Sequence, residues 1–126
     1  MKEIIFTKDA PAPIGPYSQG VKAGNTIYLS GQIAINPETN ELEIDDITSE
    51  THRVMKNIEA LLIKAGSSFE RVIKCSIFLS DMRNFNAVNE VYGQYFGEKP
   101  PARECVEVSV LPKNVNVEIS VIALAG

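Results

Sequence analysis

Three side chains near the C-terminal end of the chain have the chemistry to act on a small carboxylic acid: Arg103, Cys105 and Glu118. An arginine guanidinium stays charged at any cellular pH, and its planar fork matches a carboxylate with two parallel hydrogen bonds. A glutamate in a partly dry cleft has a raised pKa and acts as a general base or acid near neutrality. The combination predicts a site for a small carboxylate substrate.

Alternation of apolar residues places these three side chains together. Residues 102–110 and 115–124 have the pattern of two strands, joined by a turn at 111–114. Their apolar positions fall on one face of the pair: Val106, Val108, Val110, Val115, Val117, Ile119 and Val121. If the strands pair as a hairpin, the opposite face receives the polar positions: Arg103, Cys105, Glu107, Ser109, Asn116, Glu118 and Ser120.

The register of this predicted hairpin separates the arginine from the glutamate. A turn centred on Pro112-Lys113 sets Glu107 opposite Glu118. Arg103 is then offset from Glu118 by about four residues, or ~13 Å at ~3.3 Å per residue. A substrate of keto-acid size does not span that distance, so we predict that each site takes its arginine and its glutamate from two different subunits.

Apolar periodicity and chain breakers predict the elements that hold these residues. Residues 9–16 have no regular structure, because three prolines remove hydrogen-bond donors and fix φ. Further strands are expected over 2–6, 17–23, 26–33 and 72–79, and helices over 48–65 and 82–96. Thr48 or Ser49 caps the first helix, Gly66 follows its end, and Asp81 caps the second.

This order of elements predicts an α+β fold in a single domain, residues 1–126, with both amphipathic helices on one face of a mixed sheet. The valine face of the predicted hairpin meets the helices. The opposite face, with Arg103 and Glu118, looks away from them. Because Cys105, Ser109 and Ser120 make that face too mixed for a core and too sparsely charged for ordinary surface, we expect another subunit to cover it.

Composition narrows the function classes. The 126 residues have a formal net charge of −4 and no basic run, which argues against binding to a nucleic-acid backbone. No apolar stretch approaches the length of a membrane span, and the N-terminal apolar segment is too short for a secretory signal, so we expect a cytoplasmic protein. Cys75 and Cys105 are then free thiols, and with His52 as the only histidine no metal site is expected.

Five segments of the chain resemble one known family over nearly its whole length. They are Ala-Pro-Ile-Gly-Pro-Tyr-Ser-Gln-Gly (12–20), Ile-Tyr-Leu-Ser-Gly-Gln-Ile (27–33), Phe-Asn-Ala-Val-Asn-Glu-Val-Tyr (85–92), Pro-Pro-Ala-Arg-Glu-Cys-Val-Glu-Val (100–108) and Val-Glu-Ile (117–119). On these residues the chain resembles the RidA family, also called the YjgF family. The resemblance implies a chorismate-mutase-like fold and a homotrimer with a central barrel and with sites in the clefts between subunits.

The resemblance also implies an activity: hydrolysis of reactive enamine and imine intermediates, such as 2-aminoacrylate/2-iminopropanoate and 2-iminobutanoate, to 2-keto acids and ammonia. Pyridoxal-phosphate-dependent dehydratases generate these intermediates, and the family itself uses no cofactor. Carried over by position, Arg103 anchors the substrate carboxylate and Glu118 positions water. The pocket lining is expected from Tyr17, Ser30, Gly31, Asn89 and Cys105. In the shared site, Arg103 and Cys105 come from one subunit, and Glu118, Tyr17, Gly31 and Asn89 from the next.

Each residue also has a structural interpretation. Arg103 suits a surface or interface salt bridge, and Glu118 suits pairing with a lysine across the sheet. Cys105 lacks an evident base, which favours a pocket wall over a nucleophile. Tyr17 also suits a packing role, and Asn89 suits a hydrogen bond to a loop. For the whole chain the alternatives are a trimer that binds a 2-keto acid without catalysis, and, less favoured, an endoribonuclease or a chaperone-like protein.

Overall fold

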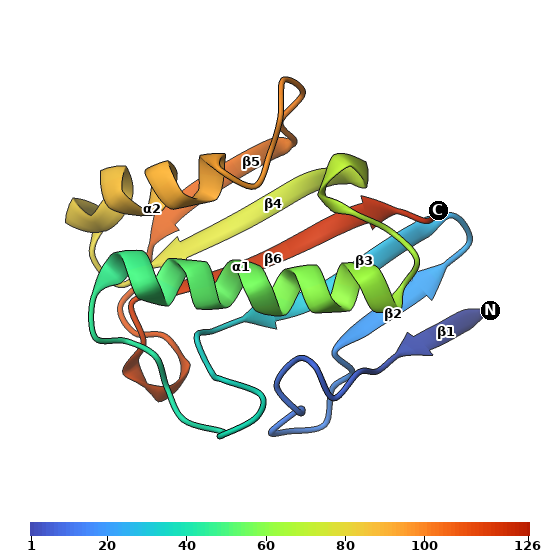
Figure 1. Ribbon diagram of the computed structural model, residues 1–126, viewed down its shortest axis with the longest axis horizontal. Helices are drawn as coiled ribbons and strands as arrows, with labels where there is room; N and C mark the ends of the chain where they lie inside the picture. The colour runs from blue at the N-terminus through green and yellow to red at the C-terminus, as the bar shows by residue number, and fades with distance from the viewer.

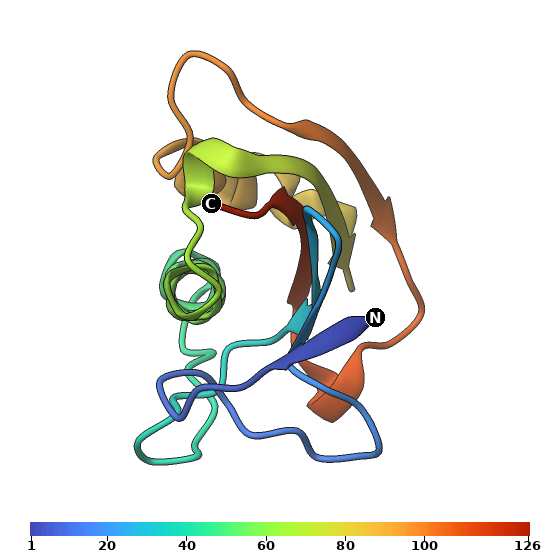
Figure 2. The ribbon, with the colours of Figure 1, turned by 90° about the vertical axis from the view of Figure 1, so that its right-hand side faces the viewer.

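The computed structural model describes all residues, 1–126, as one mixed sheet with two helices on one of its faces (Figures 1 and 2). The strands are β1 (Lys2–Ile5), β2 (Gly20–Ala23), β3 (Thr26–Gln32), β4 (Val72–Leu79), β5 (Ala102–Glu107) and β6 (Val117–Leu124). The helices are α1 (Ile47–Lys64) and α2 (Phe85–Gly93), with short 3-10 turns at Phe69–Arg71, Met82–Asn84 and Pro112–Asn114. This arrangement confirms the predicted fold class.

The order of strands in the sheet is β1-β2-β3-β6-β4-β5, so the predicted hairpin of the last two strands is wrong. β4 lies between β5 and β6. It pairs with β5 in parallel and with β6 antiparallel. The physical reason is the helix that precedes β5: a strand, a crossover helix and a second strand form a parallel unit, which leaves β5 at the sheet edge. β6 then enters the centre of the sheet between β3 and β4.

The core lies between the sheet and the two helices, as Figure 2 shows from the side. Helix α1 buries Val54, Ile58 and Leu61 completely, at the helical spacing that gives an apolar face. Strand β6 buries alternate residues against them: Val117, Ile119, Val121 and Ala123. No helix covers the opposite face of the sheet.

The helix boundaries differ from prediction mainly at their ends. The cap of α1 is Asp46, whose carboxylate accepts from the backbone N–H of Ser49 at 2.8 Å, instead of Thr48 or Ser49. Gly66 follows the helix with φ +76°, a left-handed conformation that favours glycine. Asp81 caps a 3-10 turn, and the second helix ends at Gly93, short of Phe96. Strand β2 begins at Gly20, which leaves Tyr17 in the preceding loop.

No helix of the structure has both the length and the apolar character needed to span a membrane.

Candidate functional site

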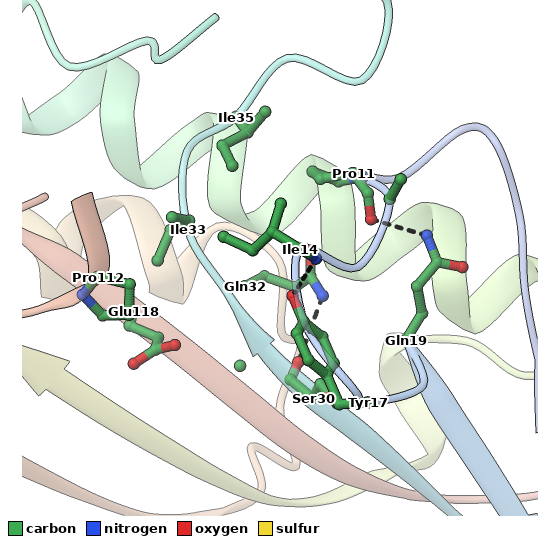
Figure 3. A pocket seen from close by; sticks show the side chains of 12 residues that line it. Pro11, Ile14, Tyr17, Gln19, Ser30, Gln32, Ile33, Ile35, Pro112 and Glu118 are labelled. Carbon is green, nitrogen blue, oxygen red and sulfur yellow. Dashed lines mark hydrogen bonds between the residues drawn. The ribbon is translucent and has the colours of Figure 1, made fainter. Parts of the chain in front are cut away.

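A pocket of about 350 Å³ opens beside Glu118, between strand β6 and the proline-rich loop of residues 7–19 (Figure 3). Its lining residues are Pro11, Ala12, Ile14, Tyr17, Gln19, Ser30, Gly31, Gln32, Ile33, Ile35, Pro112 and Glu118. Of the seven site residues predicted from the sequence, four therefore lie together here: Tyr17, Ser30, Gly31 and Glu118.

A β-bulge in β3 brings Gly31 against Glu118. The register runs from Leu29 opposite Val121 to Gln32 opposite Ile119, so Ser30 and Gly31 face a single residue of β6. A Cβ atom on Gly31 would lie 2.6 Å from Oε2 of Glu118. Real Cβ atoms do not approach so closely, so any larger residue at position 31 displaces the carboxyl group.

Burial raises the pKa of the Glu118 carboxyl, and burial is the one cause of that shift. Its neighbour across the sheet is Phe78, and Lys74, the lysine of β4, pairs with Glu104, with 2.9 Å between Nζ and Oε1. The interpretation of Glu118 as the partner of a lysine therefore fails. The half-buried carboxyl faces the pocket with no cation beside it, which suits proton transfer to and from a bound molecule.

The hydroxyl groups of Tyr17 and Ser30 are both used by the loop. Ser30 Oγ donates to the carbonyl of Ser18 at 2.6 Å, which ties the bulge to the loop. The Tyr17 hydroxyl accepts from the backbone N–H of Ile14 at 3.5 Å, the limit of a hydrogen bond, as Figure 3 shows. Both oxygens keep the capacity for a further contact with a ligand.

Arg103 lies on the other face of the sheet, against helix α2. Its partner in the β4 register is the buried Cys75, on the helix side. The guanidinium donates to Asn89 Oδ1, and its Cζ lies 5.6 Å from the ring centroid of Phe85 and 5.1 Å from that of Tyr92. No carboxylate of the same chain pairs with Arg103, so the salt-bridge interpretation fails within the chain.

Arg103 and Glu118 are therefore separated because they lie on opposite faces of the sheet. The predicted reason is different: an offset of about four residues along one face of a hairpin. Glu118 stands level with Phe78 and Val106 on the face without helices. The β5 side chains follow the reverse of the predicted pattern: Cys105 joins Arg103 on the helix face, and Val106 is 42% exposed on the open face. Asn89 contacts Arg103 of its own chain, on the helix side of the sheet. The prediction places Asn89 in the half of the site that contains Glu118.

Cys105 forms part of the wall near Arg103. It is half-buried, stands opposite Ile77 and packs against the main core. Burial raises the pKa of its thiol, and the charge of Arg103 offsets this only in part, so the thiol is protonated at neutral pH. His52 forms a contact of 2.8 Å between Nδ1 and the Tyr95 hydroxyl, so it does not serve Cys105 as a base. No group of His, Cys, Asp or Glu side chains has the arrangement of a metal site.

Sequence reasoning missed Gln19, a pocket residue that is 1% exposed. The available signal was the proline-rich segment before it. Prolines interrupt regular pairing and leave carbonyl groups that need donors from elsewhere. A buried side-chain amide supplies such donors.

Comparisons with known proteins agree on one family. The family model described as Endoribonuclease L-PSP matches residues 7–125. A RutC family protein of Pyrococcus horikoshii is 54% identical over 123 residues, covering 98% of each chain. The crystal structure of RidA from an Antarctic Psychrobacter is 42% identical with a TM-score of 0.94, over 97% of this chain and 98% of that one. The crystal structure of Escherichia coli TdcF with bound serine is 40% identical, with a TM-score of 0.94 over 98% and 99%.

Proposed function

The chain belongs to the RidA family, whose family model is named Endoribonuclease L-PSP, and from this premise we propose that it hydrolyses reactive enamine and imine intermediates to 2-keto acids and ammonia. The substrates are 2-aminoacrylate with its tautomer 2-iminopropanoate, and 2-iminobutanoate. The observation that carries this proposal is a pair of uncompensated charged groups. Arg103 has no carboxylate partner, and Glu118 has no cationic one.

In this proposal each site forms between two subunits of a homotrimer. Within one chain Arg103 and Glu118 occupy opposite faces of the sheet, so they cannot both contact a substrate of three or four carbons. Arg103, Asn89 and Cys105 of one subunit would meet Glu118 and Tyr17 of the next. The open face of the sheet supports such an assembly, because it exposes large apolar side chains: Tyr28, Val106 and Leu124.

The proposed reaction balances with water alone. Arg103 binds the substrate carboxylate through its fork. Glu118 accepts a proton from water as the water oxygen attacks C2 of the N-protonated imine (C=NH2⁺), whose C=N π electrons move to nitrogen, which gives a neutral carbinolamine. Glu118 then gives this proton to the nitrogen, the C–N bond breaks, and ammonia leaves as the carbonyl forms. The hydroxyl proton passes to Glu118 and from there to the departing ammonia, which leaves as ammonium. The enamine first takes up a proton at C3 and loses one from nitrogen to become the imine.

A second candidate function is binding of a small carboxylate without catalysis. The specific observation in its favour is the serine bound to E. coli TdcF, since serine carries a carboxylate but no imine. The endoribonuclease function in the family model's name has weaker support here. The net charge is −4, and the single histidine is engaged with Tyr95.

The test is a coupled assay in which a pyridoxal-phosphate-dependent dehydratase, the proposed metabolic source of the substrate, generates 2-aminoacrylate in place. We expect the wild type to accelerate release of the keto acid, and Glu118→Gln to lose about 10²–10⁴-fold of that acceleration while keeping 2-oxobutanoate binding. Arg103→Ala should lose both activity and binding. Arg71→Ala and Glu90→Gln are matched exposed controls. Binding by a wild type that does not accelerate release would support the second candidate instead.

A mixing experiment tests the shared site. Arg103→Ala and Glu118→Gln subunits are unfolded together, refolded as mixed trimers, and assayed. Sites that take Arg103 from one variant and Glu118 from the other are intact, so equal mixing restores about a quarter of the wild-type activity. If each site lies within one chain, mixing restores none.

A further inference from the structure

The loop of residues 7–19 forms one wall of the pocket but has almost no packing of its own at its tip. Its two large side chains at the pocket, Ile14 and Tyr17, are 61% and 48% exposed. Besides the long contact between them, the backbone bond from Tyr17 N–H to the Gly15 carbonyl (2.9 Å) holds the tip. The position of this wall must therefore be set elsewhere in the loop.

The side chain of Gln19 closes the base of the loop. Its Oε1 accepts from the Thr7 N–H at 2.8 Å. Its Nε2 donates to the carbonyls of Thr7 (3.0 Å), Ala10 (3.2 Å) and Pro11 (2.8 Å), the last of which Figure 3 shows. One amide thus binds backbone groups at both ends of the segment 7–11. It does so at a fully buried position, where an unpaired group would be costly.

A second set of hydrogen bonds connects the loop to β3 without using the Gln19 side chain. The backbone carbonyl of Gln19 accepts from the N–H of Ser30 at 2.9 Å, and Ser30 Oγ reaches Ser18. The C-terminal end of the loop is thus fixed to β3 whatever residue stands at position 19. Among the hydrogen bonds of the loop, only those of the Gln19 amide connect that fixed end to residues 7–11, where the wall begins.

We propose that Gln19 is a positioning residue, which holds the wall formed by Pro11, Ile14 and Tyr17 over the Glu118 pocket and thereby sets how tightly a substrate is bound. It acts through the loop and takes no part in proton transfer. The consequence for activity rests on the proposed function, whereas the clamp itself is tested independently of it.

Hydrogen exchange tests the clamp. In Gln19→Met, an apolar side chain of similar length, the Thr7 amide loses its acceptor and should exchange at least about tenfold faster. The Ser30 amide, which bonds to the backbone of residue 19, should keep its protection and serves as the internal reference. Gln94→Met, at an exposed amide after α2, should change neither. A wild-type Thr7 amide that is already unprotected would overturn the clamp.

Steady-state kinetics test the positioning role. We expect Gln19→Met to raise KM about tenfold with kcat changed by less than about threefold, because the wall affects binding more than the proton-transfer step. If Gln19→Met does not fold, Gln19→Glu is used, which keeps the shape and places an oxygen against three carbonyls. Faster Thr7 exchange with unchanged KM would reduce Gln19 to a purely structural role and overturn the proposal.

A failure of the proposed function is recognised separately. If the wild type does not hydrolyse imines, the same variants are compared by calorimetry with 2-oxobutanoate. A Kd about tenfold higher in Gln19→Met would uphold the positioning role for a binding protein. An equal Kd, or no binding by the wild type, would overturn it.

Discussion

Arg103 and Glu118 lie on opposite faces of one sheet, and the chain holds them in opposite ways. Arg103 is fixed from three directions by Asn89 and by the rings of Phe85 and Tyr92. Glu118 faces the open pocket, and its carboxyl lies against Gly31, in the place that a side chain at position 31 would take. The two groups have different requirements. An anion-binding arginine gains from being positioned before the substrate binds, whereas a group that transfers protons must remain free of permanent partners.

The largest effect is expected from placing a side chain at position 31, where the Glu118 carboxyl lies. In Gly31→Ala the new Cβ would lie 2.6 Å from Oε2, so the carboxyl group must move by roughly an ångström, and a displacement of that size costs on the order of 100-fold in kcat/KM. The measurement is the coupled imine assay. Gly97→Ala is the matched control, because nothing lies within 4 Å of its added Cβ, and it should stay within about twofold of wild type.

Wild-type activity in Gly31→Ala would contradict the role proposed for Glu118. It would show that the carboxyl does not act from the position in which the structure holds it.

The next effect concerns the shape of the anion-binding group. Arg103→Lys keeps the charge but loses the planar fork, the bond to Asn89 and the ring contacts, so we expect a KM or Kd about 10–100-fold higher. Arg71→Lys, at an exposed position in a 3-10 turn, controls for the substitution. A lysine variant that binds as well as the wild type would mean that charge alone suffices and that the contacts of Arg103 do not matter for recognition.

How far the sequence predicts this arrangement depends on the range of the interactions. Helix α1 and strand β4 follow from local periodicity, and β4 matches its predicted bounds, Val72–Leu79. The neighbours of β5 do not follow, because β5 and β6 are adjacent in sequence and yet separated by β4. Alternation shows which residues lie on the same side of one strand. It does not show whether that side faces the helices or the open face of the sheet. The sequence pattern therefore predicts that the valines of β5 face the helices, whereas in the structure Val106 faces the open side.

The candidate site shows the same limit. Family motifs identify its residues by position, including Gly31. Position 31 requires a glycine because it lies against Glu118 of β6, and no local sequence pattern predicts that contact. Gln19 lies within a quoted motif, but its role depends on carbonyl groups up to 12 residues away.

A smaller effect is expected in the pH dependence of stability. Burial raises the pKa of Glu118 above its ordinary value of 4.5, so the folded state binds a proton more tightly than the unfolded state. Stability due to this group is therefore present at pH below 4.5 and is lost as the pH rises through the raised pKa. Glu118→Gln removes this loss, so its Tm should exceed that of the wild type at pH 7 and approach it near pH 4.

Glu90→Gln, at an exposed site on α2, controls for the removal of a carboxylate. A Glu118→Gln protein that is less stable than wild type at pH 7 would mean that the assembled protein supplies Glu118 with a stabilising partner, and the contrast with Arg103 would then no longer hold.

The smallest effect separates the ring of Tyr92 from its hydroxyl. The ring lies 5.1 Å from the Arg103 guanidinium, while the hydroxyl is buried with no hydrogen-bond partner, and burial raises its pKa so that it stays neutral. Tyr92→Phe keeps the ring and removes an unsatisfied polar group, so we expect unchanged kcat/KM and a free energy of unfolding equal to wild type or up to about 1 kcal/mol higher. Tyr92→Leu removes the ring and should weaken 2-oxobutanoate binding several-fold. Calorimetry and thermal unfolding of the two variants decide whether the aromatic ring of Tyr92 holds Arg103. If Tyr92→Phe weakens binding as much as Tyr92→Leu does, the hydroxyl matters and the ring does not. Arg103 is then positioned by Asn89 and Phe85 alone.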